Sequence, residues 1–431
     1  MSFTPKAILF LLICTAVTFF VQREEDGGAV DGVNRTYVDW LRGNSKQQLS
    51  SPSVTLLSID EEQAPILQNW PPEPLDFSIM LRRLQLCEPK VVAAEPALKW
   101  DDADEGQLEI LRTAGLKFDP GQLLLGSVLQ YNQAAPPLKP STLSLLRPLP
   151  AENIEGEVDQ LPEFTTVASL PDRRLTAIGA PVGFTEIDLG DEAPPGSALS
   201  APLLARAGNT VIPSFVLLAT MLDLDASPAD LHVRLGHEIT IKGELSIPID
   251  SRGSLKVFTD LRPSLPVSKA SILVLDPSSD GGGAGGQLGK EERMALESRI
   301  VVLGMNDENS RVIPLGGGAK ISRAELFALA IATIQSGRYI DRVAPSVKWA
   351  ICAFIVLLGL LLIRMPRKRG FGLALLAVIL YFIGNMILFQ STPRWVPPAV
   401  PLALLACVLL ATLTLGAAGG RQAEASGSDG E

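Results

Sequence analysis

Four apolar blocks near the two ends of the chain constrain its fold more than any other feature. They cover residues 7–21, 349–363, 371–389 and about 396–415, and none contains a charged residue. A helix needs about 20 apolar residues to cross the roughly 30 Å hydrocarbon core of a bilayer. Local thinning of the bilayer accommodates a somewhat shorter block. We therefore predict an integral membrane protein with one N-terminal and three C-terminal transmembrane helices.

The charges beside these blocks predict the orientation of the chain. The loop between the second and third blocks contains Arg364, Arg367, Lys368 and Arg369, and short loops rich in Lys and Arg stay in the cytoplasm. The first block fits either an uncleaved anchor or the apolar part of a signal peptide, and both export the region after it. Because no A-x-A cleavage site comes next, the anchor is favoured. We expect both ends of the chain in the cytoplasm and the large central region outside.

This topology divides the chain into four expected parts. They are a cytoplasmic start with its anchor, an extracytoplasmic domain, three transmembrane helices and a disordered cytoplasmic tail, at residues 1–22, 23–347, 348–416 and 417–431. The tail is short, acidic and rich in Gly and Ser, a composition typical of disorder. The expected location is the inner (cytoplasmic) membrane of a bacterial cell envelope, with the large domain on the extracytoplasmic side.

Alternating strand and helix patterns predict an α/β fold with a mainly parallel sheet for the external domain. Residues 54–59 and 91–94 have the composition of buried strands, and residues 77–86 between them have helical spacing. Short connections of this kind favour parallel pairing. The pattern recurs later, with a strand at 299–304 and a helix that Ser322 opens and Gly337 ends. Further expected elements are a helix at 107–114, a strand at 122–129, a helix at 213–224 and hairpins within 231–249.

The order of these motifs resembles the CHASE type 2 family of extracytoplasmic sensor domains. The carrying segments include SVTLLSIDEEQAPILQNWPP, LRRLQLCEPKVVAAEPAL, IPIDSRGSLKVF, SRIVVLGMN and ISRAELFALAIATIQSGRYI, at 53–72, 81–98, 247–258, 298–306 and 321–340. The resemblance implies one membrane helix before the domain and several after it. It also implies a sensory role. The sequence departs from the family at Ala94-Glu95-Pro96, where an Asp is usual, and no cyclase or kinase segment comes after the membrane helices.

Carboxylates follow three of the expected strands and form the candidate binding site. Asp60, Glu61 and Glu62 follow the first strand and Glu95 the second, so we expect them at the ends of neighbouring strands, where open parallel sheets bind ligands. Asp307, after the strand at 299–304, is a weaker candidate for the same site. Such carboxylates bind a cation through oxygen or act as acid and base. The alternative is that they cap helices and pair with Arg or Lys.

Several function classes have little support. The formal net charge of −10 argues against nucleic acid as a partner. Of the four Cys only Cys87 lies outside the apolar blocks, so the external domain has no internal disulfide. The acidic run at 101–105 lacks the spacing of a calcium loop and is better interpreted as a solvated helix start. No nucleophile elbow and no metal motif is present, so we expect no catalytic residues, no metal and no cofactor.

Two functional hypotheses remain. The first is a membrane-anchored extracytoplasmic sensor that binds an unknown small ligand or envelope protein. Without a catalytic output of its own, it would signal through a partner membrane protein. The second is a structural or assembly component of a cell-envelope complex. An envelope enzyme is a third and weaker possibility, because it would need an activated nucleophile or a metal.

Overall fold

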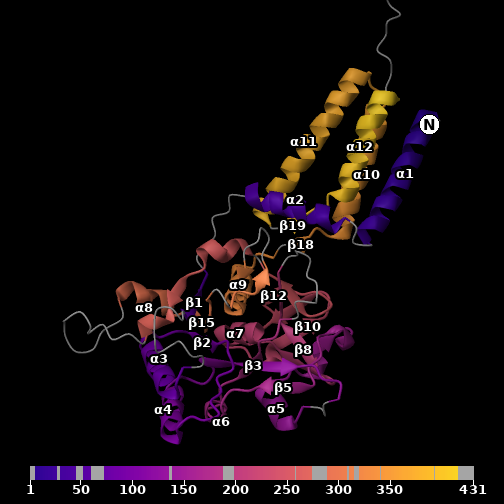
Figure 1. Cartoon of the computed structure of the whole chain (residues 1–431). Coiled ribbons are helices and arrows are strands. Elements are labelled where there is room, and N and C mark those ends of the chain that lie inside the picture. Colours follow the sequence, from indigo (N-terminus) through magenta and orange to yellow (C-terminus); the bar gives the residue numbers. More distant parts are fainter. Residues whose placement is uncertain are drawn as a thin grey trace, which may run out of the picture. The chain divides into compact units, whose positions relative to one another are not determined.

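The computed structural model describes residues 5–26, 30–44, 52–59, 72–134, 138–187, 199–257, 259–273, 289–307, 310–314, 320–339, 341–392 and 394–415. The chain forms two compact units. One contains Met1–Gln48 with Ile340–Glu431, and the other contains Leu49–Tyr339 (Figure 1). The predicted disordered tail at 417–431 lies outside the described residues.

The first unit contains the apolar helices. Helices α1 (Pro5–Asp26), α10 (Pro345–Leu362) and α11 (Arg367–Ser391) each contain a segment long and apolar enough to cross a membrane. The fourth predicted block forms α12 (Ala399–Thr414), an apolar helix of 16 residues. Helix α12 contacts each of the other three. One N-terminal and two C-terminal candidate spans are therefore present, with a shorter apolar helix among them.

Two polar contacts join segments of this unit. The Lys348 ammonium on α10 donates to Oε1 of Gln22 at 2.8 Å and lies 2.9 Å from Oε2 of Glu25, both on α1. The Asn385 side chain accepts a hydrogen bond from the backbone N–H of Val396 at 3.1 Å, just before α12 begins. Asn385 is the one strongly polar residue in the third block.

A seven-stranded sheet forms the centre of the second unit. Its strand order is β14-β1-β15-β2-β3-β5, with β6 also beside β3. All pairings are parallel except that of β5 with β3. The bounds are β1 Val54–Ile59, β2 Val91–Ala94, β3 Leu123–Gln130, β5 Thr166–Ser169, β6 Val182–Phe184, β14 Val267–Lys269 and β15 Ile300–Met305. The expected mixed α/β fold with parallel pairing is therefore present.

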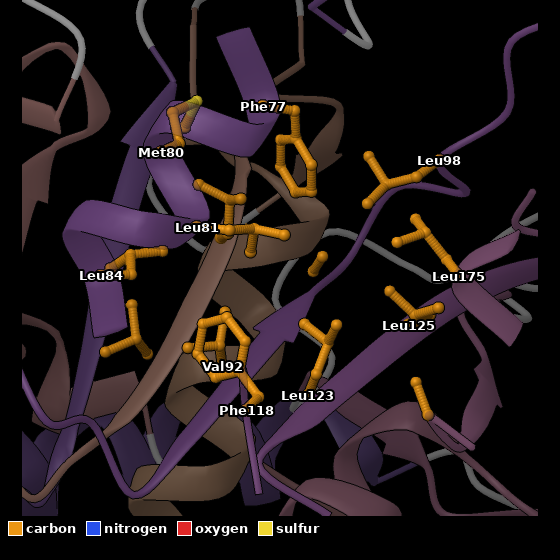
Figure 2. Packing of buried hydrophobic residues seen from close by; sticks show 14 of the residues in the cluster. Phe77, Met80, Leu81, Leu84, Val92, Leu98, Phe118, Leu123, Leu125 and Leu175 are labelled. Carbon is orange, nitrogen blue, oxygen red and sulfur yellow. The ribbon is translucent and has the colours of Figure 1, made fainter. Parts of the chain in front are cut away.

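Helices cover both faces of this sheet. On one face, α3 (Pro74–Leu86) and α4 (Glu105–Gly115) bury a cluster that includes Phe77, Leu81 and Val92 (Figure 2). On the other face, α7 (Phe215–Asp223) and α9 (Arg323–Ser336) contact the strands. Burial of a large apolar side chain stabilises a fold by about 1.5–3 kcal/mol. A core of this extent holds the unit together without a disulfide, and all four Cys are free.

The remaining helices and strands are short. An antiparallel meander of β10, β11 and β12, joined by β4, confirms the hairpins expected within 231–249. The other bounds are α2 Asp31–Asn44, α5 Pro140–Leu145, α6 Arg173–Thr176, α8 Lys290–Leu296, β4 Ile154–Glu155, β7 Ser200–Pro202, β8 Leu204–Ala207, β9 Thr210–Pro213, β10 Leu231–Arg234, β11 Glu238–Ile241, β12 Leu245–Pro248, β13 Ser254–Lys256, β16 Ile313–Pro314, β17 Lys320–Ile321, β18 Asp341–Arg342 and β19 Arg394–Trp395.

One expectation about pairing is wrong. Strands β1 and β2 are not neighbours, because β15 lies between them and pairs with both. The crossover through α3 skips one position in the sheet, and a strand more than 200 residues later in the sequence fills it. The strands β12 and β13 pair with different partners. Strand β12 pairs with β11, and β13 pairs with β7.

Candidate functional site

Glu95 lies at the carboxyl edge of the sheet, immediately after β2. Its backbone N–H donates to the carbonyl of Leu303 in β15 at 2.9 Å, and the residue is only 3% exposed. The Arg323 Nε donates a hydrogen bond to Oε1 of Glu95. Arg323 is the first residue of α9, whose N-cap Ser322 accepts from the N–H of Glu325 at 3.1 Å. This ion pair therefore joins the start of α9 to the end of β2.

The close approach of α9 to this edge depends on Gly304 in β15. A Cβ at this position would collide with the Cβ of Ala324 and would lie 3.3 Å from Oε2 of Glu95. Any larger residue would separate the helix from the strand or displace the Glu95 carboxylate. Gly304 thus makes room for the ion pair between Glu95 and Arg323.

A second carboxylate, Glu186, lies near this ion pair. It follows β6, where the Thr185 hydroxyl donates to the carbonyl of Ser127 in β3 at 3.0 Å and fixes the chain. Both carboxylate oxygens of Glu186 are shielded from solvent, and neither accepts a hydrogen bond of good geometry from the described residues. Most buried polar groups have such a partner, so an exception calls for an explanation.

Burial raises the pKa of both carboxyl groups. For Glu95 the positive charge and the hydrogen bond of Arg323 oppose the rise in pKa. For Glu186 burial raises the pKa to about 7, although nearby backbone groups of Leu129, Thr185 and Glu186 itself and the charge of Arg323 act in the other direction. Arg323 bonds directly to Glu95, whereas Glu186 has no charged hydrogen-bond donor among the described residues.

A further ion pair holds the first turn of α9. The Arg262 Nε lies 2.5 Å from Oε1 of Glu325, and its terminal nitrogen donates to Oε2 at 3.3 Å. The spacing of Ser322 and Glu325 is that of a capping box, of which only the Ser322 half forms. Ser322 caps the helix as expected, but the Glu325 carboxylate bonds to Arg262. The first turn of α9 thus contains one cation paired to the sheet edge and one anion paired to a neighbouring segment.

Asp307 follows β15, whose parallel pairing with β1 and β2 places it at the expected sheet edge. Its Oδ1 accepts from the N–H of Ser310 at 2.9 Å, and its carbonyl accepts from the Ser310 hydroxyl at 2.9 Å. Asp307 thus forms a local turn. The preceding Asn306 has a buried Oδ1 that accepts no hydrogen bond from the described residues.

The five predicted site residues fall into two groups. Asp60, Glu61 and Glu62 lie outside the described residues. Glu95 and Asp307 lie at the carboxyl edge, and of these only Glu95 has an ion pair among the described residues. The role of these carboxylates in binding stays a prediction. Within the described residues, no group of three or more His, Cys, Asp and Glu side chains is arranged to hold a metal ion.

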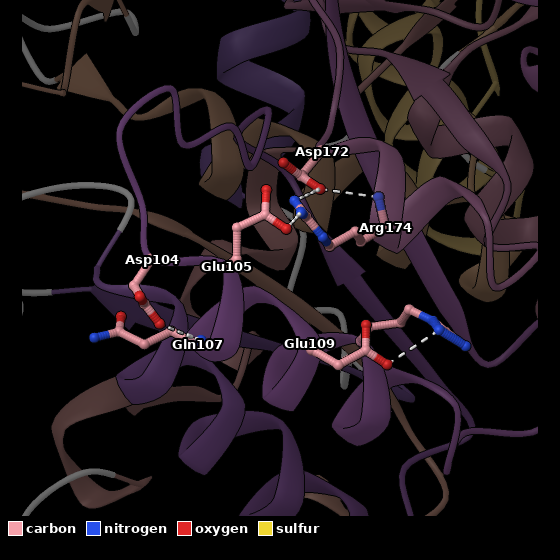
Figure 3. Close-up of polar contacts among 7 residues, drawn as sticks. Asp104, Glu105, Gln107, Glu109, Asp172 and Arg174 are labelled. Atoms are coloured by element: carbon pink, nitrogen blue, oxygen red, sulfur yellow. Dashed lines mark hydrogen bonds and ion pairs between the residues drawn. The ribbon is translucent and has the colours of Figure 1, made fainter.

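The acidic run at 101–105 starts a helix, as expected. The Asp104 side chain accepts from the N–H of Gln107 at 3.1 Å and caps α4 (Figure 3). Glu105 in the first turn is 2.7 Å from Arg174, and the Asp172 side chain caps α6 by accepting from the Arg174 N–H at 2.9 Å. These carboxylates are already bonded to protein donors.

Two residues of the site, Glu186 and Arg323, were not predicted to belong to it. The sequence does contain a signal for Glu186. The apolar run Pro181–Phe184 is followed two residues later by this carboxylate, just as apolar runs precede Asp60 and Glu95. Arg323 has no comparable local signal, since its partner is distant in the sequence. Comparison with known proteins adds no information here: no family model, no curated protein and no solved structure matches the chain.

Proposed function

We propose that the chain is a membrane-anchored sensory protein whose α/β unit lies outside the cytoplasm and binds a ligand at the carboxyl edge of its sheet. The observation that carries the proposal is the Glu186 carboxylate, which is shielded from solvent and, although backbone groups lie nearby, accepts no hydrogen bond of good geometry from the described residues. A buried carboxylate of this kind requires a donor or a cation to be stable in its charged form. The expected ligand therefore has a positive charge or several N–H or O–H donors.

The location of the cluster supports the proposal. Ligands of open parallel sheets bind outside the carboxyl ends of the strands, and strongly perturbed pKa values concentrate at functional sites. Glu95, Glu186 and the start of α9 meet this description. The resemblance to CHASE type 2 domains, an independent argument, also favours a sensory role.

The proposed orientation rests on the charges of the membrane unit. Arg364 follows α10 and the run Arg367-Lys368-Arg369 begins α11, and short basic segments between two spans remain in the cytoplasm. The chain then leaves the cytoplasm through α1, and α12 is the fourth span of a bilayer that is locally thin. In this arrangement the α/β unit is extracytoplasmic and the membrane is the inner one of a bacterial envelope.

Helix α9 provides the proposed route from the ligand to the membrane. Its first residue is paired to Glu95, and only residues 337–344 separate its last turn from α10. A ligand that competes for Arg323 or neutralises Glu186 would favour one position of α9 over another. Sensing requires such a difference in affinity between two states. A partner membrane protein would read the state of α10 and its neighbours.

A thermal-shift screen of the full chain in nanodiscs tests ligand binding. The probes are putrescine, spermidine, arginine, Mg²⁺ and Ca²⁺, each applied to the wild type, Glu186→Gln and the surface control Glu109→Gln. We expect at least one probe to raise the melting temperature of the wild type and of the control, but not of Glu186→Gln. The proposal fails if no probe shifts the wild type, or if Glu186→Gln responds equally.

One observation favours the second candidate, an assembly role. A groove of about 610 Å³ lies between α1 and α10, with Thr15 and Thr18 on one side and Trp349 and Val356 on the other. Small and hydroxyl side chains allow helices to associate closely in membranes. If the chain is an assembly component, affinity purification from mildly solubilised membranes should yield a stoichiometric envelope complex. If the sensing proposal holds, a signalling enzyme should be recovered instead.

A further inference from the structure

The short helix α2 has an apolar face that packs within the membrane unit. Tyr37 and Leu41, one turn apart on α2, are buried at 7% and 0% exposure and pack with Phe389 and Trp395. Helix α2 lies across the end of the bundle at which α11 ends (Figure 1). Its axis crosses those of α1, α10 and α11, which have the length and composition of membrane spans (Figure 1).

Aromatic rings connect α2 to α11. The Tyr37 and Trp40 rings stack with centroids 5.9 Å apart, and the Trp40 ring meets Phe382 edge-on at 5.7 Å. The Tyr37 ring also contacts Phe382, at 6.0 Å. Clusters of Trp and Tyr are typical of the level at which the lipid headgroups meet the hydrocarbon.

Part of the apolar face of α2 is not covered by protein. Trp40 is 41% exposed and Val33 is 54% exposed. Beneath Trp40 lies a groove of about 350 Å³ whose lining is entirely apolar: Trp40, Ile379, Phe382, Ile383, Met386 and Ile387. The α11 residues of this lining belong to a candidate membrane span, whose composition fits a hydrocarbon surrounding.

We propose that α2 is an interfacial membrane helix and that the groove beneath Trp40 holds an acyl chain of a phospholipid. The lipid belongs to the leaflet at the end of the bundle away from the basic loop. The lining offers no polar group, which matches a hydrocarbon chain and would leave the polar atoms of any other occupant unpaired. Amphipathic helices with Trp on their apolar face bind at this depth. This inference is independent of any ligand at the sheet edge.

Fluorescence quenching by brominated phosphatidylcholine tests the position of Trp40. The full chain is reconstituted in vesicles with bromines at carbons 6 and 7 of the acyl chain, as wild type, Trp40→Phe and Trp100→Phe. Trp100 is the control, because its indole N–H bonds to the carbonyl of Pro72 within the α/β unit. We expect the quenched part of the emission to fall in Trp40→Phe and to remain unchanged in Trp100→Phe. Equal quenched emission in the wild type and Trp40→Phe would overturn the proposal.

Photo-crosslinking tests the groove itself. A phosphatidylcholine with a diazirine on its acyl chain is incorporated, and its adducts on α11 are mapped by mass spectrometry. Ile383→Trp fills the groove, and Leu361→Trp, at an exposed position on α10, is the matched control. We expect adducts near Ile383 to fall several-fold in Ile383→Trp only. Equal labelling in both variants would mean bulk lipid contact alone, and an adduct to another protein would mean a partner helix. Either result contradicts a lipid groove.

Discussion

Arg323 Nε donates a hydrogen bond to Oε1 of Glu95, and this contact joins residues that are 228 positions apart in the sequence. Glu95 immediately follows β2, and Arg323 is the first residue of α9. The Glu95 side chain is almost fully buried, whereas Arg323 remains 39% exposed. The pair therefore connects a shielded anion at the sheet edge to a cation that a ligand can still reach.

Removal of Arg323 should destabilise the α/β unit. Arg323→Met leaves the Glu95 carboxylate buried without its partner, which costs about 3 kcal/mol of unfolding free energy, the low end expected for a buried pair. Arg112→Met is the control, because Arg112 pairs with Glu109 on the surface and such pairs contribute about 0–1 kcal/mol. Urea denaturation of the full chain in detergent micelles measures both. Equal losses would show that the buried pair has no special role.

Stability should depend on pH through Glu186. Its pKa is raised from 4.5 to about 7, so between these values the folded state keeps a proton that the unfolded state releases. The free energy of unfolding therefore decreases as the pH rises from about 4.5 to 7 and is constant above that range. Glu95, whose pKa is also raised, contributes in the same direction.

The isosteric change Glu186→Gln should remove part of this pH dependence. At pH 8 the variant should be more stable than the wild type by about 3 kcal/mol, because no charge is then buried. The stability curves of both proteins, measured from pH 4 to pH 8, should converge at the acidic end. Parallel curves, separated by the same amount at every pH, would contradict an elevated pKa at Glu186.

Gly304→Ala should also be destabilising, although alanine is tolerated in strands. The added methyl group meets Ala324 and approaches Glu95, and overpacking of this kind costs about 1–3 kcal/mol. Gly372→Ala in α11, where a Cβ has open space, is the matched control and should have little effect. Chemical denaturation distinguishes the two. A neutral Gly304→Ala would mean that α9 moves easily away from the sheet.

The Lys348 and Glu25 pair should stabilise the membrane unit. Their side chains are 9% and 5% exposed, so Lys348→Met leaves a buried anion. Loss of one partner of such a pair costs about 3–5 kcal/mol. The charge swap Lys348→Glu with Glu25→Lys should recover part of this loss. Unfolding in mixed micelles of increasing dodecyl sulfate content measures the series. No recovery in the swap would mean that Lys348 acts through Gln22 or by its size alone.

Local patterns were sufficient to predict much of the fold. The helix α9 was predicted with both of its ends, because a serine N-cap and a glycine with φ of 60° define them. Strands β1 and β15 were predicted from largely apolar runs, which are typical of strands buried on both faces. The apolar helices α1, α10 and α11 were also predicted from composition, because their length and apolar character are those of membrane spans.

The arrangement of the sheet edge was not predictable from the sequence. The insertion of β15 between β1 and β2 depends on contacts between residues that are far apart in the chain. The strand β6, which places Glu186, has only three residues within a segment rich in proline. The pairing of Glu325 with Arg262 rather than with the helix N-terminus likewise depends on tertiary contacts. Periodicity carries no information on such contacts.

The side of the membrane on which the α/β unit lies is the central claim, and cysteine labelling tests it directly. Ser251→Cys introduces a thiol at an exposed turn of this unit, and Lys368→Cys introduces one in the basic loop. A membrane-impermeant maleimide is applied to intact spheroplasts and, separately, to lysed ones. For an extracytoplasmic α/β unit, we expect Ser251→Cys to be labelled in intact spheroplasts and Lys368→Cys to be labelled only after lysis. Labelling of Lys368→Cys in intact spheroplasts, with Ser251→Cys protected until lysis, would contradict this orientation.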